Sequence, residues 1–276
     1  MTVEYGSPAY IAFILFTLAI PTALFFMFRK RSDRVKKYLI LGIMLLNIAQ
    51  HFLKSVLYPH LGLEGFTIFS TAYNVCAFLI IASPLAMLFR FKFLRDFFFY
   101  VGTIAGMIAI AVPYWSIGKP FWDADYIRSF ICHSLLFTSS VLPLMFGFHK
   151  TSYKSFYKVG LCFVAAIGLI LLNDALCIYL GIYPGVSAED GVFNALATIN
   201  PLWTFGPPDN FAWVRGIVKF FVPDSWVGVS GTDCLPVLWY ALPLYLGVTL
   251  IAFFICLFTQ LYVRAKVRMR EKQDKK

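Results

Sequence analysis

The stretch NIAQHFLK, residues 47–54, interrupts a segment that is otherwise apolar enough to lie within the hydrocarbon of a membrane. Its four polar residues follow the spacing i, i+3, i+4 and i+7, which places them on one face of a helix. They are Asn47, Gln50, His51 and Lys54. Such a face is costly against lipid, and the lysine most of all. The stretch therefore predicts a bundle of membrane helices with this face turned inward.

The composition of the whole chain agrees with an integral membrane protein. Of 276 residues, 60% are hydrophobic and 14% are charged, and the mean hydropathy is +0.75. A helix needs about 20 apolar residues to cross about 30 Å of hydrocarbon. Runs of this length predict an all-α fold, a single membrane domain over residues 1–276 with seven transmembrane helices. The expected spans are residues 8–28, 37–58, 66–90, 96–118, 127–148, 156–181 and 233–263.

The basic residues predict the orientation of the bundle. The links after the first, third and fifth expected spans, together with the tail 264–276, hold 19 of the 24 Lys and Arg residues. Basic segments beside a membrane helix stay in the cytoplasm, so we expect the N-terminus outside and the C-terminus inside. Most of the net charge of +10 is this topological signal. We expect a multi-pass protein of the plasma membrane whose partners are membrane lipids and not nucleic acid.

The longest link, residues 182–232, lies on the outer side in this topology. It carries three tryptophans, and its stretch FAWVRGIVKFFV, residues 211–222, has apolar residues at helical spacing. Tryptophan favours the headgroup zone, so the stretch predicts a helix lying on the outer membrane face. This helix either covers an opening or serves only as an anchor.

Polar residues of four expected helices fall at one depth. The third span repeats the polar spacing at Thr67, Ser70, Thr71 and Asn74, the fifth brings Cys132 and His133, and the sixth brings Asn173 and Asp174. At 1.5 Å per residue these groups lie about 9 to 15 Å below the outer surface. A shared level predicts an outward-facing polar cavity, with a purely structural polar core as the alternative.

The six cysteines show no CxxC pair and no histidine at metal-ligand spacing. We therefore expect no metal site and no cofactor. A disulfide among the outward Cys132, Cys177 and Cys234 remains open.

The polar layer holds the parts of a covalent catalyst. Cys76 supplies a nucleophile, His133 a base, and a buried carboxylate such as Asp174 an orienting group. A transporter or a small-molecule or lipid-binding protein would use the same layer, with Asp174, His51 and Lys54 as titrating groups. A seven-helix receptor shares the topology, which is an analogy of fold alone.

Three stretches resemble a known family. YNVCAFLI (73–80), FICHSLLF (130–137) and LLNDALCIYLGIYPGV (171–186) resemble segments of bacterial YwaF-type integral membrane proteins. These are similar in turn to the eukaryotic seven-helix ether-lipid acyltransferase (transmembrane protein 164) family, and more distantly to androgen-induced hydrolases of fatty acid esters. The bacterial pattern places a His and an acidic residue where this chain has Asn74 and Ala77.

The resemblance implies a lipid acyltransferase or acyl-ester hydrolase acting within the membrane. It implies Cys76 as the nucleophile and His133 as the general base, with Asn173 at the place of a family Asn. Asn74 is expected to donate a hydrogen bond to an oxyanion. The residues expected to bind the substrate are Asn47, Gln50, His51, Lys54, Thr71, Asn74, Asn173 and Asp174.

Overall fold

A computed structural model describes residues 2–60, 68–89, 91–113, 116–153, 156–183, 185–189, 191–199 and 238–273. Within these ranges the chain is built from helices, and the β-bridge between Thr2 and Pro120 belongs to no strand. In chain order the elements are α1 (Pro8–Phe28), α2 (Asp33–His60), the short 3-10 helix η1 (Ile68–Ser70), α3 (Val75–Leu88), α4 (Lys92–Ala111), α5 (Ala124–Met145), α6 (Phe156–Tyr179), α7 (Val192–Ile199) and α9 (Leu238–Gln273).

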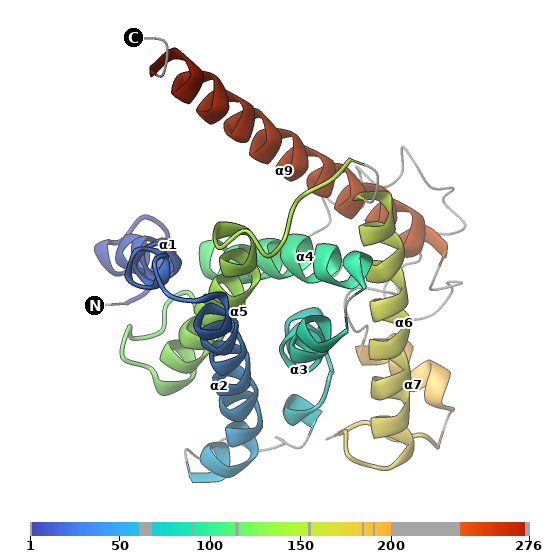
Figure 1. The fold of residues 1–276 in the computed structure, drawn as a ribbon. Coiled ribbons are helices and arrows are strands. Elements are labelled where there is room, and N and C mark those ends of the chain that lie inside the picture. Colours follow the sequence, from blue (N-terminus) through green and yellow to red (C-terminus); the bar gives the residue numbers. More distant parts are fainter. Residues whose placement is uncertain are drawn as a thin grey trace.

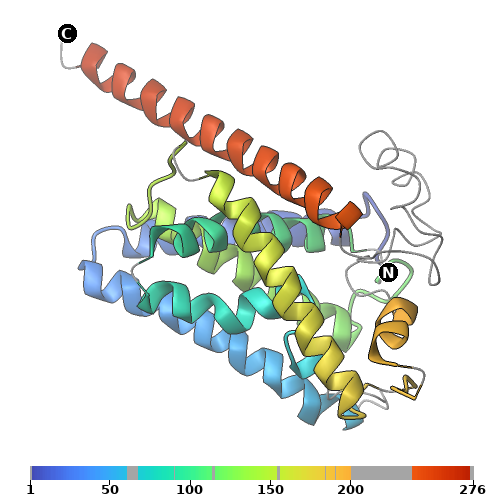
Figure 2. The ribbon, with the colours of Figure 1, turned by 90° about the vertical axis from the view of Figure 1, so that its right-hand side faces the viewer.

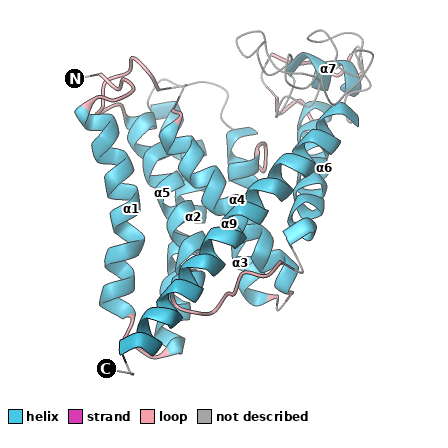
Figure 3. Ribbon diagram, turned by 90° about the horizontal axis from the view of Figure 1, so that it is seen from above, coloured by secondary structure: helices cyan, strands magenta, loops and turns pink. Residues whose placement is uncertain are grey.

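Helix α5 lies at the centre of the bundle. It packs against α1, α2 and α4, while α3 fills the space between α2 and α4. Helix α6 packs against α4 on one side and against the long α9 on another, as Figures 1 and 2 show. The start of α1 and the helix α7 lie at one end of the bundle, and the end of α9 lies at the other (Figure 3).

Helices α4 and α5 approach closely at two glycines one helical turn apart, Gly102 and Gly106. A Cβ atom added at Gly106 would lie 2.9 Å from the backbone nitrogen of Phe137 and 3.0 Å from the carbonyl oxygen of His133. One added at Gly102 would collide with the hydroxyl of Ser140. Small residues at this spacing let membrane helices pack backbone to backbone. The pair fixes the position of α5, which carries His133.

Five helices are long and apolar enough to cross a membrane, within the described part of the chain. They are α1, α4, α5, α6 and the stretch Tyr245–Tyr262 of α9. Helix α3 is apolar but has only 14 residues, and α2 carries the polar face described above. The protein is therefore an α-helical membrane protein with several membrane-spanning helices, as the hydropathy predicts.

The expected third span is shorter than the sequence predicts. Residues 68–70 form the 3-10 helix η1, a turn follows, and α3 begins only at Val75. The physical reason lies in the short polar side chains, which bond to nearby backbone. The Thr71 hydroxyl donates to the carbonyl of Ile68 (2.7 Å), and the Asn74 side chain accepts from the amide of Ala77 (2.8 Å). These bonds favour turns and helix caps over helix interior. The prediction of one polar helical face through Thr71 and Asn74 was wrong.

Other expected boundaries also differ from the structure, and α4 ends at Ala111 where the expected span reaches residue 118. Helix α2 begins at Asp33, earlier than the expected residue 37, and α9 continues to Gln273, so residues 264–273 of the expected basic tail are helical. Helix α7 lies inside the long link of residues 182–232. The helix expected over residues 211–222, the three tryptophans of the link and Cys234 lie outside the described residues.

Candidate functional site

The polar face of α2 points into the bundle, as its spacing predicts. Asn47, His51 and Lys54 are at most 5% exposed. The Asn47 side-chain amide donates to the carbonyl of Cys132 (3.0 Å), and the Gln50 amide donates to the carbonyl of Arg128 (2.9 Å). Both acceptors belong to the backbone of α5. The two amides therefore join α2 to α5 one turn apart, a role that membrane asparagine and glutamine commonly have.

His51 and Lys54 form a buried pair on the next turn of the same face. The Lys54 ammonium lies 3.2 Å from Nδ1 of His51, and Nε2 of His51 lies 3.2 Å from the carbonyl oxygen of Thr71. A carbonyl oxygen can only accept, so Nε2 carries a proton and donates. An ammonium can only donate, so Nδ1 carries the lone pair. The contacts thus select the Nε2–H form of His51, with Lys54 as the donor to Nδ1.

Thr71 links this pair to α6. Its carbonyl accepts from His51, and its hydroxyl accepts from the Asn173 side-chain amide (3.0 Å) while donating to Ile68. The Asn173 amide also donates to Oδ1 of Asp174 (3.1 Å). The structure therefore brings His51, Lys54, Thr71, Asn173 and Asp174 into one hydrogen-bonded group spanning α2, the turn before α3, and α6.

Asp174 has an unsatisfied oxygen. The residue is 1% exposed, and among the described residues its Oδ2 has no hydrogen-bond partner. The hydroxyl of Ser70 is likewise buried without a partner in the described part of the chain. A buried carboxylate oxygen is costly unless a donor, a proton or a cation meets it. Asp174 is therefore a group with binding capacity that the described side chains leave unused.

Cys76 lies at the amino end of α3. Asn74 is the N-cap and Cys76 occupies the second helical position. Since the Asn74 carboxamide oxygen accepts from Ala77, it is the Nδ2 group of Asn74 that can donate to a substrate. The thiol is half-buried and free, and it lies within electrostatic range of Lys54 and of Cys132. The positive end of the helix dipole and the Lys54 side chain are the positive groups beside this thiol, and they act against the cost of burying a thiolate.

His133 lies on α5, where a backbone carbonyl fixes its ring. Nδ1 lies 2.7 Å from the carbonyl oxygen of Ser129 and 3.3 Å from the Ser129 hydroxyl. The carbonyl requires a donor, so Nδ1 carries a proton and Nε2 has the lone pair in the neutral ring. Both contacts of Nδ1 are with Ser129 of the same helix, and neither involves Cys76. Lys54 is within electrostatic range of both residues.

Two of the three cysteines considered for a disulfide are free thiols in the structure. Cys132 and Cys177 are both buried and unbonded to another sulfur, and Cys234 lies outside the described residues. No group of three or more His, Cys, Asp or Glu side chains with metal-binding geometry occurs among the residues that the structure describes.

Sequence reasoning missed several groups around this site. Arg128, one turn before Cys132, forms a salt bridge with Asp125 (2.8 Å), and its positive charge lies within range of Lys54. The i, i+3 spacing of Asp125 and Arg128 was the available signal. The backbone carbonyls that accept from Asn47, Gln50 and His51 have no signal in a sequence, because every residue has one.

Taken together, the apolar helices and the polar groups between them define a multi-pass helical membrane protein. The profile of the TMEM164 family matches residues 5–182, well over half of the chain, and the chain belongs to this family. The matched range covers α1 to α6 and thus every predicted site residue, while α7 and α9 lie beyond it. No curated protein and no solved structure matches the chain. The resemblance to bacterial YwaF-type proteins stays a prediction.

Proposed function

We propose that this chain is an intramembrane enzyme that hydrolyses or transfers acyl esters of membrane lipids, with Cys76 as nucleophile and His133 as general base. The observation that carries the proposal is the place of Cys76 in the first turn of α3. The first amides of a helix have no acceptor within the helix. When the carbonyl carbon of a substrate lies at Cys76 Sγ, these amides can donate hydrogen bonds to the carbonyl oxygen, on which negative charge develops.

The reaction divides into two acyl transfers. Cys76 Sγ bonds to the ester carbonyl carbon, and the thiol proton passes to Nε2 of His133. The C–O bond to the leaving alcohol then breaks, and the imidazolium returns the proton to that alcohol, which leaves a thioester on Cys76. In the second half, water or a lipid hydroxyl attacks the thioester and gives its proton to His133. The C–S bond then breaks, and the imidazolium returns the proton to the Cys76 sulfur. Water completes a hydrolysis and the lipid hydroxyl completes a transfer.

The neighbouring groups have positioning and electrostatic roles in this mechanism. The Ser129 carbonyl holds the His133 tautomer that the base requires. The Lys54 ammonium favours the thiolate and the oxyanion. Asn74, through its Nδ2 group, adds a donor for the oxyanion, and Asn173 and Asp174 contact the substrate together with Thr71. Asn47 and Gln50 hold α2 and α5 in register through their hydrogen bonds to the α5 backbone.

The topology that suits this site has seven spans, with the N-terminus outside and the site near the outer surface of the plasma membrane. The basic links support it. The positions of the first and last helices support it too, since the start of α1 and the end of α9 lie at opposite ends of the bundle (Figure 3), as an odd number of crossings requires. Cysteine labelling of intact cells at Tyr5 and Tyr262, each changed to cysteine, tests the orientation.

The test of the activity is detection of the acyl-enzyme. The purified full-length protein is incubated with a phospholipid that carries an alkyne-tagged acyl chain, and covalent label sensitive to hydroxylamine is measured. We expect label on the wild type and none on Cys76→Ala. The matched control is Cys162→Ala, because Cys162 is also a half-buried free thiol but lies on α6 away from the polar layer. Label that persists in Cys76→Ala would contradict the proposal.

A second candidate function is binding or transport of a small polar molecule, and the unsatisfied Oδ2 of Asp174 favours it. In that case Asp174→Asn abolishes ligand binding, whereas Cys76→Ala leaves it intact. The two variants therefore separate the candidates. An enzyme fails with Cys76→Ala, and a carrier fails with Asp174→Asn.

A further inference from the structure

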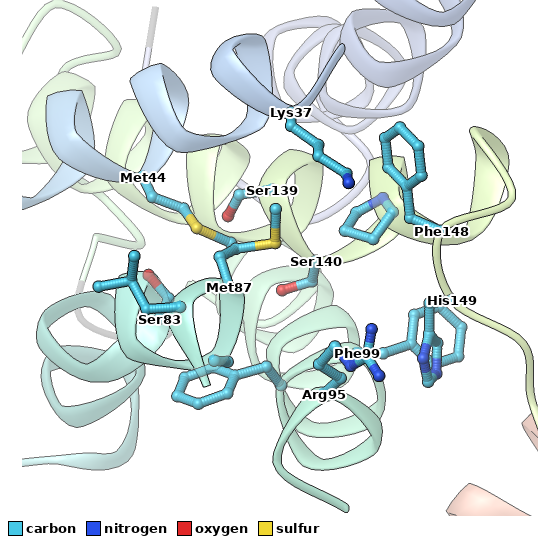
Figure 4. Close-up of a pocket in the computed structure, with 14 residues that line it drawn as sticks. Lys37, Met44, Ser83, Met87, Arg95, Phe99, Ser139, Ser140, Phe148 and His149 are labelled. Carbon is cyan, nitrogen blue, oxygen red and sulfur yellow. The ribbon is translucent and has the colours of Figure 1, made fainter. Parts of the chain in front are cut away.

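A cavity of about 510 Å³ lies at the other end of the bundle from Cys76 and His133. Four helices form it, at the start of α2, the end of α3, the start of α4 and the end of α5 (Figure 4). On α2, the wall residue Lys37 lies fourteen positions before His51, which is about 20 Å along the helix. The cavity is therefore separate from the polar layer of the candidate site.

The cavity wall combines cations and hydroxyl groups. Lys37 and Arg95 bring positive charge from α2 and α4, and three serines bring hydroxyls. Figure 4 shows Lys37, Ser140 and Arg95 around the same space. The wall residues with polar side chains are Lys37, Ser83, Arg95, Ser139, Ser140 and His149. Among the described residues that line the cavity none is a carboxylate, so this wall attracts an anion.

The carboxylate next to Arg95 in the chain, Asp96, has partners of its own. Asp96 is fully buried, its Oδ1 lies 3.1 Å from Nε2 of His149, and its Oδ2 lies 3.3 Å from the ammonium of Lys92. The Asp96 carboxylate therefore lies between the His149 ring and the Lys92 ammonium. Asp96 itself is not among the residues that line the cavity.

The remaining wall is apolar and suits a hydrocarbon chain. Met44 of α2 and Met87 of α3 meet across the cavity in Figure 4. Methionine fills irregular space and adapts to flexible chains. Leu88, at the end of α3, is 69% exposed. In a membrane this exposed side chain meets lipid, so an acyl chain can run from the bilayer into the cavity without crossing a polar surface.

We propose that this cavity binds an anionic membrane lipid, with the lipid phosphate at Lys37 and Arg95 and the acyl chain along Met44 and Met87. Arginine donors suit phosphate oxygens, and a lysine adds a point charge. The basic end of the bundle is the cytoplasmic end in the expected topology, where the leaflet is rich in anionic lipid. Neither the catalytic proposal nor the role of Cys76 is needed for this site.

Native mass spectrometry of the full-length protein in neutral detergent tests the proposal. Dioleoyl phosphatidylglycerol and dioleoyl phosphatidylcholine, which share their acyl chains, are titrated separately, and inorganic phosphate is titrated as a competitor. We expect one phosphatidylglycerol to bind about tenfold more tightly than phosphatidylcholine, because both carry the phosphate but only phosphatidylcholine brings a choline cation beside Lys37 and Arg95. We expect millimolar phosphate to leave the bound lipid in place. Displacement by phosphate would identify a site for the free anion and overturn the lipid assignment.

Two neighbouring lysines provide a matched control. Lys37 lines the cavity, whereas Lys36 pairs with Asp33 (3.2 Å) and lies over the ring of Phe146. We expect Lys37→Gln to remove the preference for phosphatidylglycerol and Lys36→Gln to keep it. Arg95→Gln should repeat the loss, and because Lys37 is exposed, its variant remains informative if Arg95→Gln fails to fold. Equal effects of Lys36→Gln and Lys37→Gln would show general surface attraction and overturn the proposal.

Discussion

The Lys54 ammonium donates to Nδ1 of His51 across 3.2 Å, between two residues that are nearly inaccessible to solvent. The same ring donates through Nε2 to the carbonyl of Thr71. A single imidazole thus receives the hydrogen bond of a buried cation and passes one to the turn before α3. This contact explains how α2 carries a lysine within a membrane bundle, since a buried charge needs a hydrogen-bonding partner.

The pair predicts a non-additive response to mutation. We expect His51→Leu to destabilise the protein by about 2 to 3 kcal/mol, because Lys54 loses the nitrogen that accepts its bond. The double variant His51→Leu with Lys54→Leu should recover most of this loss, since apolar residues can replace a buried polar pair at little cost. Thermal unfolding in detergent of the wild type, the two single variants His51→Leu and Lys54→Leu and the double variant measures the coupling between the two residues. Additive losses would mean that the two residues act independently.

The comparison of α2 with α3 shows what helical spacing can predict. On α2, the spacing of Asn47, His51 and Lys54 correctly gave the buried face. The same spacing at Thr71 and Asn74 failed, because these short side chains bond to adjacent backbone and end the helical run. Spacing identifies a face only where the run is helical throughout, as it is at Asn47 within α2 and is not at Asn74, the N-cap of α3.

The hydrogen-bond partners of the site residues were less predictable from the sequence than the depth of these residues in the bundle. The partners of Asn47, Gln50 and His133 are backbone carbonyls, and a side-chain pattern carries no information about them. The cavity at Lys37 and Arg95 was also missed. Its basic residues were interpreted as a topological signal, and the serines that complete the wall are distributed over α3 and α5. Only the packing of four helix ends brings them together.

The unsatisfied oxygen of Asp174 predicts a stabilising substitution. Asp174→Asn keeps an oxygen that can accept from Asn173 and removes a buried carboxylate with an unused Oδ2. We expect a gain of about 1 to 2 kcal/mol, measured by thermal unfolding, because burying an uncompensated charge is costly. Asp125→Asn is the control. It loses a salt bridge with Arg128 and should cost up to about 1 kcal/mol. A loss in Asp174→Asn would show that the carboxylate has a donor beyond Asn173.

The substitution Gly→Ala should have opposite effects at a crowded glycine, Gly106 between α4 and α5, and at an uncrowded one, Gly168 of α6. Gly168 of α6 has open space around an added Cβ, so Gly168→Ala should stabilise by about 0.5 to 1 kcal/mol through helix propensity. Gly106→Ala should destabilise by about 1 to 3 kcal/mol, because its Cβ would lie 2.9 Å from the backbone of Phe137 and overpack the interface. Unfolding in detergent measures both. Stabilisation by Gly106→Ala would mean that α4 moves away from α5 at little cost.

The hydrogen bond of His133 predicts which of two neighbouring variants loses activity. If His133 is the base of the proposed reaction, His133→Gln should slow formation of the acyl-enzyme by about 10²- to 10⁴-fold, the usual contribution of a general base. Ser129→Ala removes the hydroxyl at 3.3 Å but keeps the carbonyl at 2.7 Å that fixes the tautomer, so its rate should stay within about threefold. Time courses of thioester formation at saturating lipid compare the variants. Equal losses in both would assign the effect to packing of α5, and an unchanged rate in His133→Gln would remove His133 from the mechanism.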